Sequence, residues 1–197
     1  MYKVVILNGR PRCGKDTFAE MCQHLMPYQT VQIISTVDFV KDLAYKAGWD
    51  GNKDLKSREF LSDLKDVLTK WNDVPYKKCE KKIKWHENLL KEFDKDGITF
   101  VMCREPEEIQ KFEDRLDAVS VLVRRPSVET EETSNHADER VFDHKYQYTI
   151  ENSGTLDDLE ESAKTFLAVL LGPEIKFERA YTIERSANFK EGALCND

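Results

Sequence analysis

Short apolar runs alternate along the chain with longer stretches in which apolar residues recur every three or four positions. The short runs are rich in β-branched residues, and each stops at a polar residue, glycine or a charged pair, which is typical of buried strands. They predict strands at 4–7, 31–34, 98–103, 118–123 and 146–150.

The longer stretches have the periodicity of amphipathic helices. They predict helices over about 15–26, 35–47, 57–72, 75–93, 106–116 and 156–171. Ser35 with Asp38, and Thr155 with Asp158, have the spacing of capping boxes. Because strands alternate with helices, we expect an α/β fold with a parallel sheet covered on both faces. Ligands of such sheets bind at the carboxyl ends of the strands, so the functional residues are expected there.

Composition narrows the class of partner. A chain of 197 residues, 40% of them hydrophobic, suits one compact domain. Its net charge of −7 makes it a poor nonspecific ligand for nucleic acid or an anionic membrane. The five cysteines include no CxxC pair, which argues against a disulfide framework or a zinc site. We expect a cytoplasmic protein with small-molecule partners, without a signal peptide or a membrane span.

The stretch NGRPRCGKDTFAE, residues 8–20, lies between the first strand and the first helix. Glycines in this frame let backbone N–H groups approach a phosphate, and the helix start adds partial positive charge. Lys15 supplies a mobile charge for the β- and γ-phosphates. The hydroxyl that usually follows the lysine arrives one place late, at Thr17. The residues expected to bind ATP are Gly9, Arg10, Arg12, Cys13, Gly14, Lys15, Asp16 and Thr17, with Thr17 also at Mg²⁺.

A glycine-rich turn without a ligand is the alternative for this loop. The strand before it, the helix after it, Thr17 and the nearby arginines together favour nucleotide binding. Asp16 is favourable in the first turn of a helix, and we expect its side chain to point away from a triphosphate.

The late hydroxyl in GKDT resembles the loop of adenylate kinase and related nucleoside monophosphate kinases. More specifically, GKDT resembles deoxynucleoside monophosphate kinases of the phage type, and also animal-type phosphomevalonate kinase. Further stretches resemble the phage type, and with the loop they cover most of residues 1–171. They are STVDFVKDLA (35–44), SREFLSDLKDVLTKWNDVP (57–75), CREPEEIQKF (103–112), VLVRRP (121–126), NHADERVFD (135–143) and YTIENSGTLDDL (148–159).

The resemblance implies a three-layer P-loop kinase fold with a five-stranded parallel sheet and a lid insertion. Residues 1–172 would form the kinase domain, with an acceptor-binding helical region at about 35–97 and a lid at about 124–145. Residues 173–197 lie outside the resemblance as a C-terminal extension, with a hairpin possible at its start. The extension is a candidate interface for a homo-oligomer.

The implied reaction is ATP- and Mg²⁺-dependent phosphoryl transfer to a nucleoside or deoxynucleoside monophosphate, giving the diphosphate. The positions of Arg124 and Arg125 resemble those of lid arginines, and Arg140 is a further candidate. Because side chains of a strand alternate, we expect at least one of the adjacent pair to face the site. The alternative is that one faces solvent or pairs with Glu129, Glu131 or Glu132.

The expected acceptor site contains Asp38, Lys41, Arg58, Arg104 and Glu105. Arg104 resembles the arginine that binds the acceptor phosphate in this family, and Arg58 is a second clamp. Each has a structural alternative: a helix cap for Asp38, a solvated helix start for Arg58, and a salt bridge to Glu105 or Glu108 for Arg104. No clear Walker-B aspartate ends a strand, so Glu105 is the candidate for ordering magnesium-bound waters.

Three further sets of residues have plain structural roles as alternatives to functional ones. Asn152 and Gly154 precede the last helix where related kinases pass the adenine ring, although a turn explains both. The spacing of Trp49 and Trp71 favours core packing over base stacking. A metal cluster is disfavoured for His136, Asp138, Glu139 and His144, because no HExxH motif is present.

Two other functions stay open from the sequence. The acceptor is either a nucleotide or another phosphorylated metabolite such as phosphomevalonate; for a hydroxyl acceptor, Asp38 is the best candidate base. A nucleotide-binding regulator without turnover is the other reading, and the late hydroxyl and the missing Walker-B aspartate support it. Lys15 and the arginines favour the kinase.

Overall fold

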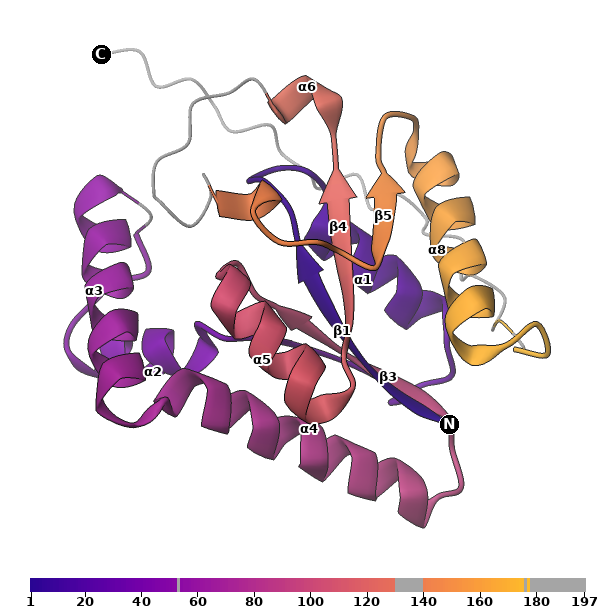
Figure 1. Ribbon diagram of the computed structural model, residues 1–197, viewed down its shortest axis with the longest axis horizontal. Coiled ribbons are helices and arrows are strands. Elements are labelled where there is room, and N and C mark those ends of the chain that lie inside the picture. The colour runs from indigo at the N-terminus through magenta and orange to yellow at the C-terminus, as the bar shows by residue number, and fades with distance from the viewer. Residues whose placement is uncertain (53, 130–139, 176, 178–197) are drawn as a thin grey trace.

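The computed structural model describes residues 1–52, 54–129, 140–175 and 177. Its strands form one sheet in the order β2-β3-β1-β4-β5, and all four pairings are parallel (Figure 1). This confirms the expected α/β fold with a five-stranded parallel sheet. The strands are β1 (Tyr2–Asn8), β2 (Val31–Ser35), β3 (Gly97–Met102), β4 (Val119–Arg124) and β5 (Tyr148–Glu151).

The helices lie close to the predicted ranges. They are α1 (Lys15–Leu25), α2 (Asp38–Lys46), α3 (Leu55–Asn72), α4 (Val74–Glu92), α5 (Pro106–Leu116), α6 (Pro126–Glu129), the 3₁₀ turn η1 (Arg140–Phe142) and α8 (Leu156–Leu171). The capping box of Thr155 with Asp158 is confirmed. The one at Ser35 forms only in part: the carboxylate of Asp38 accepts from the N–H of Ser35, but Ser35 is still paired in the sheet and α2 begins only at Asp38, without a side-chain cap.

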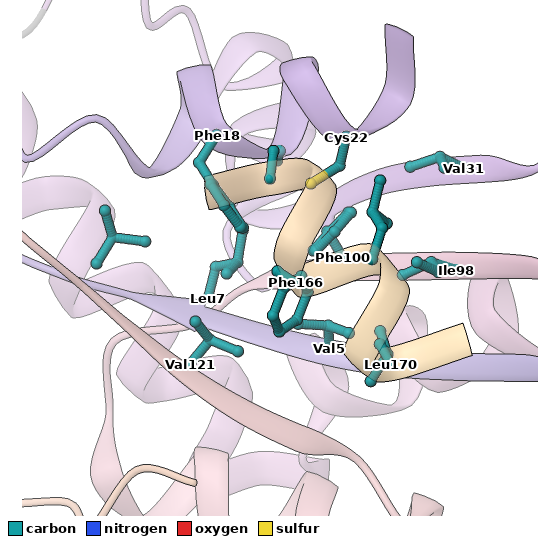
Figure 2. Packing of buried hydrophobic residues seen from close by; sticks show 14 of the residues in the cluster. Val5, Leu7, Phe18, Cys22, Val31, Ile98, Phe100, Val121, Phe166 and Leu170 are labelled. Carbon is teal, nitrogen blue, oxygen red and sulfur yellow. The ribbon is translucent and has the colours of Figure 1, made fainter. Parts of the chain in front are cut away.

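The sheet is covered on both faces because β1 alternates between them. Odd-numbered residues of β1 join a cluster with α1 and α8, and even-numbered ones join a cluster with α4 and α5. Figure 2 shows Phe18 and Phe166 over Val5 and Leu7, and the two phenylalanine rings lie 5.6 Å apart, edge to face. Each fully buried side chain of this size contributes about 1.5–3 kcal/mol. These layers fix the carboxyl end of β1, where the candidate loop begins.

Helix α3 departs from the prediction. None of its residues is fully buried, and Trp71 is 77% exposed, so core packing for Trp71 was wrong. In Figure 1, α3 stands at the left edge, away from the sheet. Its apolar stripe therefore has no sheet to cover it. Trp49 is half-buried; it packs on Tyr45, with ring centroids 4.7 Å apart, and donates to the carbonyl of Asn52.

Part of the expected lid and most of the extension lie outside the described residues. Of the lid, α6 and η1 are described, and residues 130–139 are not. The lid insertion and the domain boundaries therefore stay predictions, as does a hairpin in the extension.

Candidate active site

The loop between β1 and α1 has the backbone that a phosphate-binding loop needs. Gly9 has φ +155° and Gly14 has φ +94°. A Cβ atom at Gly9 would lie 2.4 Å from the carbonyl oxygen of Val123, and one at Gly14 would lie 2.3 Å from Nδ2 of Asn152. Both positions therefore require glycine, for the left-handed backbone and for the close approach.

The first turn of α1 is left open to an anion. Gly14 occupies the N-cap, and no side chain caps the turn. The first helical hydrogen bond runs from the N–H of Phe18 to the carbonyl of Gly14, over 2.9 Å. The N–H groups of residues 15–17 precede it and have no helical acceptor, which is the usual basis of anion binding at a helix start. Asp16 is exposed, and Thr17 is half-buried.

Lys15 is only 8% exposed. Within the described ranges, no carboxylate forms an ion pair with its ammonium group. A buried ammonium without a counter-charge is costly, so this arrangement suits an anionic ligand. Burial raises the pKa of the neighbouring Cys13 thiol, although the charge of Lys15 opposes the rise. Cys13 is therefore a neutral packing group.

Asn152 holds the loop from the other end of the chain. It is 7% exposed; its Nδ2 donates to the carbonyl of Cys13 over 2.8 Å, and its own N–H donates to the carbonyl of Arg124 over 2.7 Å. This contact with the loop was not foreseen. Gly154 is exposed, and a Cβ there would lie 2.4 Å from Oδ2 of Asp158, so the capping box of α8 leaves it no room for a side chain.

Arg124 is the member of the adjacent pair that lies beside the loop. Its guanidinium and that of Arg10 both contact the ring of Phe142, at 5.9 and 5.6 Å from the ring centroid. Arg125 is exposed. Arg124 also makes two hydrogen bonds of 2.8 Å to Glu129, which is one of the pairings that the sequence left open.

Arg140, in η1, pairs with the acidic start of α5. It donates to both carboxylate oxygens of Glu107, over 3.2 and 2.5 Å, and to Asp143 over 3.3 Å. Glu105 lies 3.9 Å away. The structure thus brings Arg140 and Glu105 together, next to Arg104 at the end of β3.

The acceptor candidates come from three elements. The carboxylate of Asp38 accepts from the N–H of Ser35 over 2.9 Å and lies 3.5 Å from Nζ of Lys82, so a local capping role is present. Lys41 is half-buried on α2, and Arg104 is half-buried after β3. Arg58 is exposed in the first turn of α3.

A buried ion pair between α3 and α5 was missed by the sequence reasoning. Nζ of Lys65 lies 2.8 Å from Oε2 of Glu108, and the side chains are only 12% and 10% exposed. The thiol of Cys103 also donates to Glu108, over 3.3 Å. Burial is the largest single effect and lowers the pKa of Lys65, but the charge of Glu108, its hydrogen bond and the neighbouring Cys103 and Glu105 together outweigh burial, and the pKa is raised. Charges at inward-facing positions of two amphipathic helices were the available signal.

Two other expectations concern metals and membranes. The described residues contain no group of three side chains suited to a metal ion. His136, Asp138 and Glu139 lie outside the described residues, and His144 lies 3.3 Å from Glu113. Among the described helices, none is both long and apolar enough to span a membrane.

No protein-family model matches the chain, and no curated protein matches its sequence. Several solved structures resemble it in outline. Shikimate kinase from Aquifex aeolicus is 10% identical with a TM-score of 0.47, covering 85% of this chain and 98% of that one. A sugar kinase from Janibacter sp. is 12% identical with a TM-score of 0.44, covering 86% and 96%. An APS kinase from Mycobacterium tuberculosis is 13% identical with a TM-score of 0.41, covering 86% and 97%.

Proposed function

We propose that the chain is an ATP-dependent kinase that transfers the γ-phosphoryl group to a nucleoside or deoxynucleoside monophosphate, giving the diphosphate. The observation that carries the proposal is Lys15, an 8% exposed ammonium at the uncapped start of α1. A helix start of this kind and an ammonium without a carboxylate partner in the described ranges suit the β- and γ-phosphates of a nucleotide.

The transfer brings two anions together in line, so the site needs positive charge, fixed geometry and exclusion of water. Lys15 and the N–H groups of the loop would hold the donor phosphates, with Arg10 and Arg12 beside them. Arg124 and Arg140, and Arg125 if it turns inward, would neutralise the transferring group. The acceptor phosphate is already a nucleophile, so no general base is needed.

The acceptor and the adenine are assigned from the resemblance. Arg104 and Arg58 would bind the acceptor phosphate, and Asp38 with Lys41 would contact its nucleoside. The turn from Asn152 to Gly154 would lie beside the adenine ring. Its backbone would make the contact, because the side chain of Asn152 already binds the carbonyl of Cys13 in the loop.

Mg²⁺ fits this site only as an ion carried by the nucleotide. Thr17 in the first turn of α1 would supply a hydroxyl ligand, and Glu105 would order metal-bound water. The described residues offer no three-ligand cluster, so phosphates and water would complete the shell. When bound, the ion neutralises phosphate oxygens; the chain's own cations orient the reacting groups.

A nucleotide-binding protein without turnover is a second candidate, because Arg124 and Arg140 are each engaged by carboxylates. Both would have to exchange Glu129 or Glu107 for phosphate oxygens before they could serve in transfer. In a regulator, the ion pairs Arg124–Glu129 and Arg140–Glu107 would stay intact when ATP is bound.

The test is ADP production from ATP and Mg²⁺ with a panel of ribo- and deoxyribonucleoside monophosphates. We expect turnover with one or a few of them, lost in Lys15→Met and kept in the surface control Lys84→Met, whose side chain is 59% exposed. ATP binding is measured in parallel by calorimetry. Binding without turnover on any monophosphate would reject the nucleotide acceptor and leave the regulator or a kinase for another acceptor.

A further inference from the structure

Asn8, the last residue of β1, is completely buried and uses its whole amide group. Its Oδ1 accepts from the N–H of Gly9 over 2.8 Å. Its Nδ2 donates to the carbonyl of Arg104 over 3.2 Å and to Oη of Tyr146 over 2.7 Å. Gly9 N–H can only donate and the Arg104 carbonyl can only accept, so the amide has one orientation.

Tyr146 continues this chain in a fixed direction. Its oxygen accepts from Asn8, and its hydroxyl donates to the carbonyl of Val141 over 2.7 Å. Val141 is buried in the middle of η1. Burial raises the pKa of Tyr146, so the hydroxyl keeps the proton that it donates. We refer to the bonds joining Gly9, Asn8, Arg104, Tyr146 and Val141 as the Asn8–Tyr146 relay.

The relay links the parts that would hold donor and acceptor. Gly9 is the first residue of the phosphate-binding loop, and Arg104 is the acceptor arginine. On the other side, η1 carries Arg140, which reaches Glu107 at the start of α5, and Phe142, which contacts two more arginines. Four arginines are therefore linked to the relay. Arg104 belongs to it through its own carbonyl, and Arg10 and Arg140 are chain neighbours of Gly9 and Val141. Arg124 contacts Phe142, the chain neighbour of Val141.

We propose that Asn8 and Tyr146 are positioning residues that hold the donor loop and the acceptor arginine in one frame for phosphoryl transfer. This rests on the proposed function. Neither side chain is placed to contact a phosphate, and both act through the groups they bond. Buried hydrogen bonds face little competition from water, so they hold their partners in place. Small displacements of reacting groups lower the rate of reaction strongly.

The test compares Tyr146→Phe with the matched control Tyr148→Phe, which removes the same hydroxyl from an exposed position on β5. Tyr146→Phe keeps the ring that packs on His144, with centroids 5.0 Å apart. We expect kcat to fall about tenfold and the acceptor KM to rise severalfold, while the Kd for ATP stays within about twofold, because the Asn8–Gly9 bond remains. The control should match the wild type in all three.

Asn8→Ala is a second variant that removes the three bonds made by the Asn8 side chain and leaves only the bond from Tyr146 to Val141. It should weaken ATP binding as well, because the loop loses its bond at Gly9. Thermal unfolding of each variant shows that it is folded at the assay temperature. A lower unfolding midpoint for Tyr146→Phe with wild-type kcat and acceptor KM would overturn the proposal and leave a structural role only. Absence of turnover with any monophosphate in the wild type is a different result, since it rejects the proposed transfer to a nucleotide and, with it, the acceptor that the relay would position.

Discussion

The guanidinium of Arg124 forms a bidentate pair with the carboxylate of Glu129, with Nε and one terminal nitrogen each 2.8 Å from a carboxylate oxygen. Hydrogen bonding and the charge of Arg124 lower the pKa of Glu129, so the pair is ionised at neutral pH. A phosphate would use the same fork of N–H donors. Glu129 therefore competes with the proposed ligand for Arg124.

Removing this competition should tighten nucleotide binding. We expect Glu129→Gln to lower the Kd for ATP by about two- to fivefold, the range for a partly exposed ion pair that is screened by solvent. Glu161→Gln is the control, since Glu161 pairs with Lys164 on the outer side of α8. Calorimetric titration measures both. A Kd equal to or above that of the wild type would mean that Glu129 does not compete with the nucleotide.

Asn152 offers a test of the loop itself. In Asn152→Ala the carbonyl of Cys13 loses its donor inside the protein, and we expect the free energy of unfolding to fall by about 1–3 kcal/mol. The loop loses its support, so ATP binding should weaken as well. Urea unfolding and ATP titration give the two values, with Ser153→Ala, at an exposed neighbour, as the control. Unchanged ATP binding in a destabilised variant would show that the loop holds its shape without Asn152.

Local patterns predicted the strands and most helix boundaries well. The run Val4–Leu7 is apolar throughout because a central parallel strand is buried on both faces, and this is visible without a structure. Thr155 caps α8 through a residue three places on, which is also local. Gly9 and Gly14 could also be predicted to belong to a phosphate-binding loop, because their spacing in the sequence is a local pattern too.

Contacts between distant parts of the chain could not be predicted this way. Asn152 meets Cys13 across 139 positions, and Asn8 meets Tyr146 across 138. Periodicity also says which side of a helix is apolar but not what covers it, which explains the error at Trp71. The roles assigned to the arginines stay predictions, although the structure shows which carboxylates engage Arg124 and Arg140.

The buried pair of Lys65 and Glu108 should behave as a unit. Lys65→Met leaves a buried carboxylate without its counter-charge, and we expect a loss of about 3–5 kcal/mol in the free energy of unfolding. The double variant Lys65→Met/Glu108→Leu removes both charges and should recover most of that loss. Urea unfolding of the single and double variants gives the coupling energy. Lys91→Met, at a side chain 67% exposed, should change stability little.

Additive effects of the two substitutions would show that the ion pair contributes nothing beyond its separate side chains. Because the pair joins α3 to α5, its loss should also alter the acceptor KM more than the ATP Kd, if α3 carries part of the acceptor site. Equal changes in both would point to general destabilisation.

His86 predicts a pH dependence of stability. It is 3% exposed; Nε2 donates to the carbonyl of Gln29 over 3.2 Å, and Nδ1 lies 2.9 Å from Oγ1 of Thr99. Burial lowers the pKa of His86, and the bond to Gln29 only partly opposes it. The folded protein therefore favours the neutral ring more strongly than the unfolded chain does.

As the pH falls through about 6.5, the unfolded chain binds a proton at His86 that the folded protein does not bind. The free energy of unfolding therefore decreases. The slope from this one proton is at most about 1.4 kcal/mol per pH unit, and it vanishes below the folded pKa. Urea unfolding between pH 5 and 8 should show a smaller slope in His86→Gln than in the wild type. His24→Gln, at an exposed position on α1, should keep the wild-type slope. Equal slopes in wild type and His86→Gln would assign the pH dependence to other groups.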